Sequence, residues 1–219
     1  NTSSVNLTIT SVNDAPVSTT ASATTAEDTS VEIALTATDV DEDDLTYSVV
    51  TAPEHGTVSI TGSTATYTPE VNYNGSDSFT FKVNDGTVDS NTASVTITIV
   101  SVNDAPVSTT ASATTAEDTS VEVQLTATDV DGDTLTYSVV TAPEHGTVSI
   151  TGSTATYTPE ANYNGSDSFT FKASDGIVDS NISSVTLTIT SVNDAPVFDS
   201  ALAVSVSEST ATNTTLLTL

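Results

Sequence analysis

The stretch Gly56–Pro69, GTVSITGSTATYTP, decides the fold class of this chain. Apolar or aromatic residues alternate with Ser and Thr on both sides of Gly62. A period of two is typical of a strand with one buried face, and a glycine between two such runs marks a turn. We therefore expect one strand over residues 56–61 and another over residues 63–68.

The same alternation, rich in Val, Ile, Thr, Tyr and Phe, recurs on both sides of this stretch. About seven short strands in roughly 90 residues, without Trp or Cys, are typical of an all-β, immunoglobulin-like Greek-key β-sandwich. The other strands are expected over residues 31–38, 45–50, 78–84 and 91–100, with an opening strand within residues 17–25.

Four aromatic residues stand at alternate places along the expected strands: Tyr67, Tyr73, Phe79 and Phe81. This placement favours a role in the hydrophobic core. The alternative is an exposed patch on which sugar rings stack.

The phrase SVNDAP occurs three times, beginning at Ser11, Ser101 and Ser191, so the chain repeats with a period of 90 residues (101 − 11 = 191 − 101 = 90). The blocks 13–102 and 103–192 differ at only 12 positions. Each block is long enough to own a core, which is not true of a solenoid repeat. We therefore expect two sandwich domains in tandem.

Both ends of the chain resemble parts of further repeats. NTSSVNLTIT (1–10) is similar to NTASVTITIV (91–100), so residues 1–12 are expected to be the last strand of a truncated preceding repeat. Residues 193–219 are expected to begin a truncated, divergent third repeat. The chain is thus expected to be a window on a longer tandem array.

Charge and composition exclude several classes of function. Asp and Glu total 29 against two basic residues, Lys82 and Lys172, which gives a formal charge of −27. Nucleic acid would be repelled, so no nucleic-acid partner is expected. No apolar run approaches the roughly 18 residues of a membrane span, so no membrane insertion is expected. The sequence has no Cys, which excludes disulfides and thiolate metal sites.

The densest acidic segments are DVDEDD (39–44) and DVDGDT (129–134), each between two expected strands. Alternate carboxylates in such a segment can converge on one hard cation, and calcium takes about 6–8 oxygen ligands. An EF-hand is not supported, because Gly132 comes too early and Val140 stands where a bidentate Glu would close the loop. The alternative is an acidic loop that is simply solvated. The candidate calcium ligands in these segments are Asp39, Asp41, Asp43, Asp129, Asp131 and Asp133.

The whole chain resembles the cadherin-like tandem domains of very large bacterial surface and secreted adhesins, the repeat-in-toxin type among them. The motifs that carry this resemblance are SVNDAP, AEDT, DVDGDTLTYSVV, TAPEHGTVSI, YTPEANYNGSDSFTFKASDG and SVTLTITSV. In cadherins, an Asp/Asn-rich linker that ends in Ala-Pro binds calcium together with acids of the preceding and the following domain. The resemblance implies the same role for SVNDAP.

Residue by residue, the resemblance assigns a backbone oxygen ligand to Asn103 and a carboxylate ligand to Asp104. Two departures, Ser101 in place of the first linker Asp and the segment PEVN (69–72) in place of Asp-Arg-Glu, imply fewer or weaker ions at each junction. The remaining implied ligands are Glu27 from the preceding domain, Asp129, Asp131 and Asp175 from the following one, Asp85 as the counterpart of Asp175 in the first repeat, and Glu117, Asn193 and Asp194 at the next junction.

The expected function is that of structural extender repeats of a large bacterial cell-surface adhesin, rigidified by calcium at the interdomain junctions. The expected partners are neighbouring repeats of the same chain, with a glycan or protein ligand bound by a separate terminal domain. We expect a monomer, outside the cell or on its surface. The alternative is a directly adhesive module that binds glycan or a copy of itself. No enzymatic role is expected, because His55 and His145 lie beside Gly turns and no paired nucleophile is identified.

Overall fold

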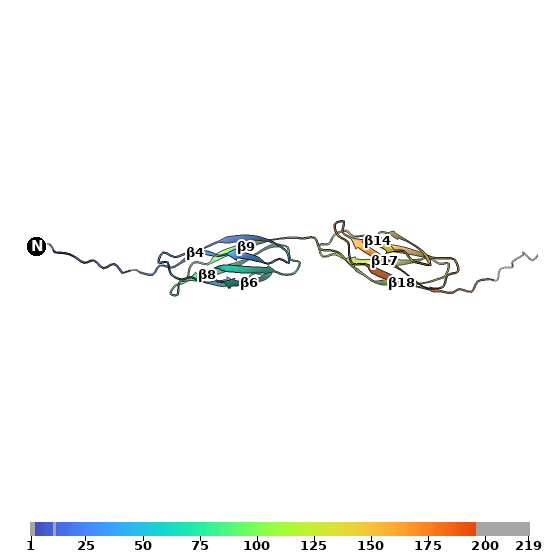
Figure 1. Ribbon diagram of the computed structural model, residues 1–219, viewed down its shortest axis with the longest axis horizontal. Helices are drawn as coiled ribbons and strands as arrows, with labels where there is room; N and C mark the ends of the chain where they lie inside the picture. The colour runs from blue at the N-terminus through green and yellow to red at the C-terminus, as the bar shows by residue number, and fades with distance from the viewer. Residues whose placement is uncertain (1–2, 11, 196–219) are drawn as a thin grey trace, which may run out of the picture. The chain divides into compact units, whose positions relative to one another are not determined.

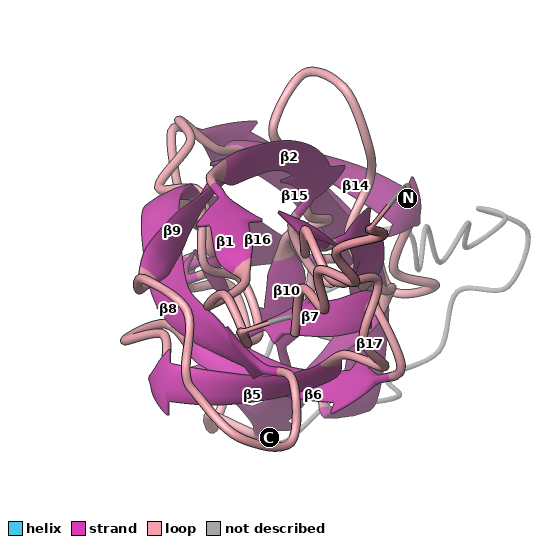
Figure 2. Ribbon diagram, turned by 90° about the vertical axis from the view of Figure 1, so that its left-hand side faces the viewer, coloured by secondary structure: helices cyan, strands magenta, loops and turns pink. Residues whose placement is uncertain are grey.

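The computed structural model describes residues 3–10 and 12–195. This part of the chain consists of strands joined by loops (Figures 1 and 2). Within it, no helix is long and apolar enough to cross a membrane. The strands of the first repeat are β1 (Val17–Thr19), β2 (Ala21–Ala26), β3 (Val31–Ala34), β4 (Thr36–Thr38), β5 (Thr46–Thr51), β6 (Gly56–Thr61), β7 (Thr64–Pro69), β8 (Gly75–Asn84) and β9 (Ala93–Val100).

The first repeat contains a four-stranded sheet in the order β2-β9-β8-β5 and a three-stranded sheet in the order β3-β7-β6. The short strands β1 and β4 pair with each other. Most neighbours are antiparallel, but β2 runs parallel to β9, from the pair Ala21↔Val95 to the pair Ala26↔Val100. At the outer edge of the larger sheet, the register of β5 against β8 shifts between Val49 and Thr51.

The second repeat has the same arrangement. Its sheets have the orders β11-β18-β17-β14, β12-β16-β15 and β10-β13. Its strands are β10 (Val107–Thr109), β11 (Ala111–Ala116), β12 (Val121–Gln124), β13 (Thr126–Thr128), β14 (Thr136–Thr141), β15 (Gly146–Thr151), β16 (Thr154–Pro159), β17 (Gly165–Ser174) and β18 (Ser183–Thr190).

The expected all-β sandwich is confirmed, although two of the expected strands are divided. The opening strand breaks at Thr20 and the strand expected over residues 31–38 breaks at Leu35. At each break the chain moves from one sheet to another, since β1 pairs with β4 whereas β2 pairs with β9 and β3 with β7. Leu35 is buried at the break, and its N–H donates to Ser63 O at 2.8 Å.

The core of each repeat consists of alternate side chains from both larger sheets. Tyr67, Phe79 and Phe81 are buried, as the alternation predicts. Tyr73 is only partly buried and packs against the edge of the core. The buried residues of the first core are Ile33, Leu35, Ala65, Tyr67, Phe79, Phe81, Val83, Ala93, Val95, Ile97 and Ile99.

A buried carboxylate fixes one end of each sandwich. Asp77, on β8, is 7% exposed and accepts four hydrogen bonds. Two come from the amides of Glu54 and His55, one from its neighbour Ser78, and one from the Tyr67 hydroxyl at 2.8 Å. In the second repeat, Asp167 accepts the equivalent four bonds. The loop before β6 is therefore anchored to the core by hydrogen bonds that satisfy both oxygens of the carboxylate.

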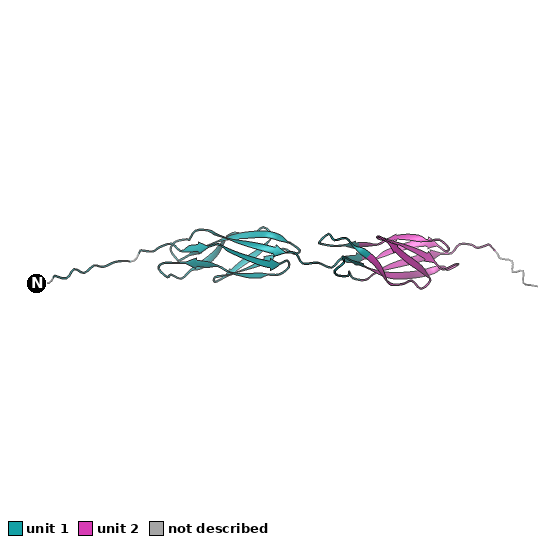
Figure 3. Ribbon diagram, turned by 90° about the horizontal axis from the view of Figure 1, so that it is seen from above, with its two compact units in different colours: residues 1–108, 127–136, 173–181 teal, residues 109–126, 137–172, 182–219 magenta. Residues whose placement is uncertain are grey.

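The chain divides into two compact units, coloured separately in Figure 3. The first contains residues 1–108, 127–136 and 173–181, and the second contains residues 109–126, 137–172 and 182–219. The predicted repeat boundaries, 13–102 and 103–192, stay a prediction from sequence, because the first unit combines segments of both repeats.

The predicted partial repeats at the two ends also stay predictions. Residues 3–10 are exposed and form no strand with the described part of the chain. The expected third repeat, residues 193–219, lies outside the described residues from position 196 onward.

Candidate metal centre

Each acidic segment folds into a loop that brings alternate carboxylates together. After β4, the amides of Asp41 and Asp43 donate to Asp39 Oδ1 at 2.9 and 3.5 Å. One carboxylate oxygen from each of these three residues lies within 4.8 Å of the others. The chain turns at Glu42, whose φ is 63°, in the left-handed region that costs a non-glycine residue about 1 kcal/mol or more.

The second repeat builds the same loop after β13. The amide of Asp133 donates to Asp129 Oδ1 at 3.2 Å, and Asp129, Asp131 and Asp133 form a second cluster with carboxylate oxygens within 4.8 Å. Here the turn is made by Gly132, with a φ of 77°. Because glycine adopts this conformation without steric cost, the second loop is formed with less strain than the first.

The SVNDAP phrase docks onto the acidic loop of the repeat that follows it. The amide of Asp104 donates to Asp131 Oδ2 at 2.8 Å, and the Asn103 side chain donates to Asp175 Oδ2 at 2.7 Å. The first copy of the phrase makes the equivalent bonds, from Asp14 to Asp41 at 2.7 Å and from Asn13 to Asp85 at 2.9 Å.

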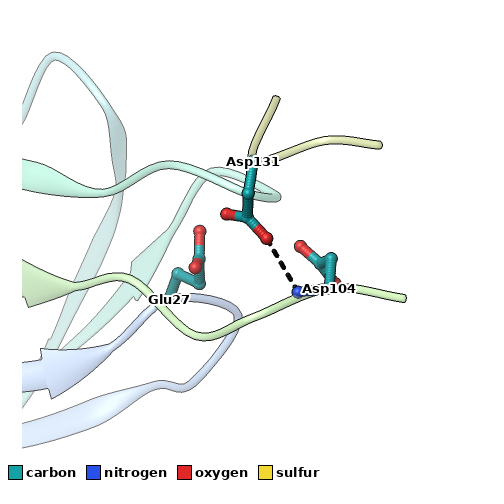
Figure 4. Close-up of side chains that lie close together, drawn as sticks. All are labelled: Glu27, Asp104 and Asp131. Carbon is teal, nitrogen blue, oxygen red and sulfur yellow. Dashed lines mark hydrogen bonds between the residues drawn. The ribbon is translucent and has the colours of Figure 1, made fainter. Parts of the chain in front are cut away.

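A buried glutamate joins this arrangement from the end of β2. Glu27 is 4% exposed, its amide donates to Val100 O at 2.9 Å, and its carboxylate accepts a bond from the amide of Val102. One carboxylate oxygen each of Glu27, Asp104 and Asp131 lie within 4.8 Å of one another, all within the first compact unit. Figure 4 shows the three carboxylates pointing toward one another.

The clustered carboxylates are poorly compensated. Burial, followed by the charges of Asp131 and Glu27, raises the pKa of Asp104. Burial, followed by the charges of Asp39 and Asp41, likewise raises the pKa of Asp43. A raised carboxyl pKa means that the anionic form is destabilised where it stands. A bound cation would relieve this destabilisation.

Three buried carboxylate oxygens in the described chain have no hydrogen-bond partner: Asp39 Oδ2, Asp104 Oδ2 and Asp129 Oδ2. Buried polar atoms are normally paired, and an exception calls for an explanation such as a bound ion. All three belong to the acidic clusters. The residues present therefore fit a hard cation that takes oxygen ligands.

Asp85 and Asp175 stand beside the clusters and are held by hydrogen bonds. The pKa of Asp85 is lowered by the amide of Val88 and then by Asn13. That of Asp175 is lowered by Asn103 and then by the amide of Val178. These two carboxylates are therefore stabilised in the charged form by the chain itself.

The structure brings together eight of the predicted ligands in three clusters: Glu27, Asp39, Asp41, Asp43, Asp104, Asp129, Asp131 and Asp133. Asn103 contributes a side-chain hydrogen bond to Asp175, while its backbone oxygen, the predicted ligand, stays untested. Glu117 is buried and accepts a bond from the amide of Val192, as Glu27 does with Val102. The Asn193 side chain donates to Asp194 O at 3.2 Å. Within the described residues, Glu117, Asn193 and Asp194 belong to none of the carboxylate clusters.

Asn13 and Asp14 were not among the predicted ligands, although they dock as Asn103 and Asp104 do. The repeated phrase SVNDAP was the signal that could have found them. Asp77 and Asp167 were not predicted either. Each is a single acid within a strand pattern, and the sequence does not show that the loop before β6 or β15 will fold over it.

Tandem immunoglobulin-like β-sandwiches with exposed Asp triads define the class of this protein. The family model described as a bacterial Ig domain matches residues 13–98 and 103–190. The chain therefore belongs to the bacterial Ig domain family. No curated protein is similar enough in sequence to count as a match.

Cadherin repeats are among the similar solved structures. Mouse cadherin-23 EC22-24 aligns with a TM-score of 0.53 and 20% identity, over 84% of this chain and 68% of that one. Human protocadherin-24 EC1-2 aligns with a TM-score of 0.52 and 16% identity, over 83% of this chain and 100% of that one. These likenesses show the fold.

Part of a larger protein also aligns with this chain in structure. An endo-fucoidan hydrolase of glycoside hydrolase family 107 aligns with a TM-score of 0.35 and 23% identity. The alignment covers 82% of this chain but only 29% of the hydrolase.

Proposed function

We propose that the two repeats are spacer modules of a large bacterial surface adhesin of the repeat-in-toxin type, and that calcium bound at the acidic clusters stiffens them. The observation that carries the proposal is the meeting of Glu27, Asp104 and Asp131. Glu27 follows a strand of the first repeat, Asp104 lies in the linker, and Asp131 lies in the loop of the second repeat. An ion held by all three would restrict how these segments move.

Calcium suits the clusters better than other common metal ions. Every candidate ligand is an oxygen, and calcium accepts about 6–8 oxygens in flexible geometry, completed by backbone carbonyls and waters. Magnesium requires near-ideal octahedral geometry, and zinc prefers Cys and His ligands. The sequence has no Cys, and neither His55 nor His145 belongs to a cluster.

A spacer role agrees with the rest of the molecule. The strands expose Ser and Thr, and the net charge of −27 disfavours self-association between like-charged copies. The proposed location is outside the cell, where weak calcium sites of extracellular modules, with dissociation constants of about 0.1–1 mM, are filled. We propose no catalytic role, a monomeric state, and a terminal domain elsewhere in the full protein that binds its glycan or protein ligand.

Small-angle scattering tests the stiffening. On adding calcium to the 219-residue chain, we expect the distribution of maximum dimensions to narrow, because ligands from both repeats become fixed to one ion. Asp104→Ala should remove this narrowing and leave both sandwiches folded. The matched control is Asp44→Ala, since Asp44 is exposed, lies outside the clusters and is already Thr134 in the second repeat. An unchanged wild-type scattering curve would contradict the stiffening, even if calcium still raised the melting temperature.

A further inference from the structure

Each repeat carries an open pocket that shares no residue with the acidic clusters, at the end where β5 leads into the loop before β6. The pocket of the first repeat has a volume of about 420 Å³ and that of the second about 460 Å³. Both volumes lie within the range of about 300–1,000 Å³ that is usual for small-molecule sites. The linings correspond residue by residue, so each compact unit holds one copy of the same pocket.

One wall of the pocket is held rigidly. Asp77 forms part of the lining and fixes the loop residues Glu54 and His55 through their amides at 3.1 and 3.0 Å. The His55 ring is stacked on Tyr73 with 4.1 Å between ring centroids, and its Nδ1 lies 3.6 Å from Glu70 Oε2. A ligand would therefore meet a preformed wall, which lowers the ordering cost of binding.

The pocket presents unused hydrogen-bonding groups. The lining includes four residues with hydroxyl side chains, Thr51, Ser76, Ser78 and Thr96, and the acidic residue Glu54. In the described part of the chain, none of these five side chains has a hydrogen-bond partner, and neither have their counterparts in the second repeat. Each hydroxyl can donate one bond and accept others, whereas the carboxylate only accepts.

The chemistry of this lining excludes most classes of ligand. A cation would find only Glu54, because both oxygens of Asp77 are occupied by donors. An anion would be repelled by Glu54 and would find neither Lys nor Arg in the lining. An apolar ligand would find Ala52 as the one aliphatic side chain of the lining. A neutral molecule with several hydroxyls remains.

From this lining we infer that each repeat binds one neutral sugar unit in this pocket. The sugar hydroxyls pair with the four Ser and Thr hydroxyls and with the Glu54 carboxylate. One shallow site of this kind binds weakly. Several copies in a tandem array would bind a surface of neutral glycans with a higher overall affinity than one site, because the later binding events are intramolecular. The inference does not depend on calcium, since the pocket and the acidic clusters share no residue.

The two histidines make the test direct, because each pocket contains one and the chain has no others. The imidazole proton signals of the full 219-residue chain are followed by NMR during titration with glucose, galactose or mannose. The titration is run in chelator at one fixed, mildly alkaline pH. We expect saturable shifts of both signals with at least one hexose and none with glucuronate. If neither signal moves with any of the three hexoses, or if glucuronate moves them equally, the inference is wrong.

A substitution in one pocket provides an internal control. Thr96→Val keeps the shape of the side chain and removes one hydroxyl, so the affinity at the His55 signal should fall by about fivefold, the effect of one hydrogen bond. The His145 signal should respond as before. Thr61→Val, an exposed strand residue outside the pocket, should change neither. An unchanged affinity at His55 in Thr96→Val would place the sugar elsewhere and overturn the inference.

Discussion

Asp77 shows how much a single side chain can decide in this protein. It is a buried acid whose four hydrogen-bond donors come from a loop, its neighbour in the strand and the core residue Tyr67. Burial alone raises the pKa of Asp77, but the bonds from Tyr67 and the amides outweigh it, and the pKa is lowered. Burial of the phenol, and then the same hydrogen bond to Asp77, raise the pKa of Tyr67.

Replacing this acid should weaken the first repeat. In Asp77→Asn, the amide nitrogen cannot accept hydrogen bonds, so some of the four donors lose their acceptor. We expect the free energy of unfolding to fall by about 3 kcal/mol, the effect of losing bonds to a buried charged group. Urea unfolding measures it, and Asp44→Asn serves as the exposed control. A loss as small as that of the control would mean that the loop is not anchored through this carboxylate.

The lowered pKa also predicts an acid dependence. A carboxyl group with a lowered pKa stabilises the fold above its unfolded pKa of about 3.9, and this contribution is lost as the pH falls through the lower folded value. We expect wild-type stability to drop below about pH 4, and more steeply than that of Asp77→Asn. Comparing the two slopes cancels the opposite effect of Asp43 and Asp104, whose pKa values are raised. Parallel slopes would contradict the assignment.

Residue spacing predicted the acidic clusters better than it predicted Asp77. Asp39, Asp41 and Asp43 alternate within one short segment, so a local turn suffices to bring their carboxylates together. Glu27 and Asp104 lie 77 residues apart (104 − 27 = 77), and only the resemblance to cadherin-like domains connected them. Asp77 could not be found in this way, because its partners come from tertiary packing.

Among the elements, the hairpin of β6 and β7 was predicted most closely. The expected strand 56–61 coincides with β6, because the alternation there is uninterrupted and Gly62 ends it. The breaks at Thr20 and Leu35 were not predicted. The alternation continues through both breaks, and what divides each strand is the sheet with which its two halves pair.

The backbone at Gly56, where this hairpin begins, is in close contact with β7, so an added methyl group there should lower the stability of the fold. A Cβ added to Gly56 would lie 2.6 Å from Thr68 O and 2.7 Å from the ring of Tyr67. Gly56→Ala should therefore destabilise the first repeat by about 1–3 kcal/mol, the usual cost of overpacking. Thermal unfolding measures it. Ser59→Ala, at an exposed site of the same strand, is the control. Equal losses of stability in the two variants would show that the hairpin can shift to accommodate the methyl group.

The edge strand β5 is protected against pairing with other chains. Its register against β8 shifts between Val49 and Thr51, so this edge strand is irregular there. Such bulges interrupt the regular row of backbone groups that another strand would need. Two exposed valines on this edge, Val49 and Val50, are therefore tolerated.

At the scale of the whole molecule, charge is the dominant feature, since −27 on 219 residues opposes compaction. Sodium chloride screens this repulsion generally, whereas calcium should bind the folded state and add RT ln(1 + [L]/Kd), about 2.7 kcal/mol at a hundredfold excess over Kd. Differential scanning calorimetry at equal ionic strength should give a higher melting temperature in calcium than in sodium chloride. Equal melting temperatures in the two salts would remove the support for calcium sites.

The tandem organisation was predicted from the period of 90 residues alone, because near-identical blocks must fold alike.

The parallel pairing of β2 with β9 affects how each repeat resists unfolding when its two ends are pulled apart. Six residue pairs, from Ala21↔Val95 to Ala26↔Val100, join the strand near the beginning of the repeat to the strand at its end. A pull on the two ends of a repeat acts at opposite ends of this ladder, so it loads the hydrogen bonds in shear. All of them must then fail together, whereas a peeling load would break them one at a time. β11 and β18 repeat the arrangement, also over six pairs, so each repeat carries the same mechanical clamp.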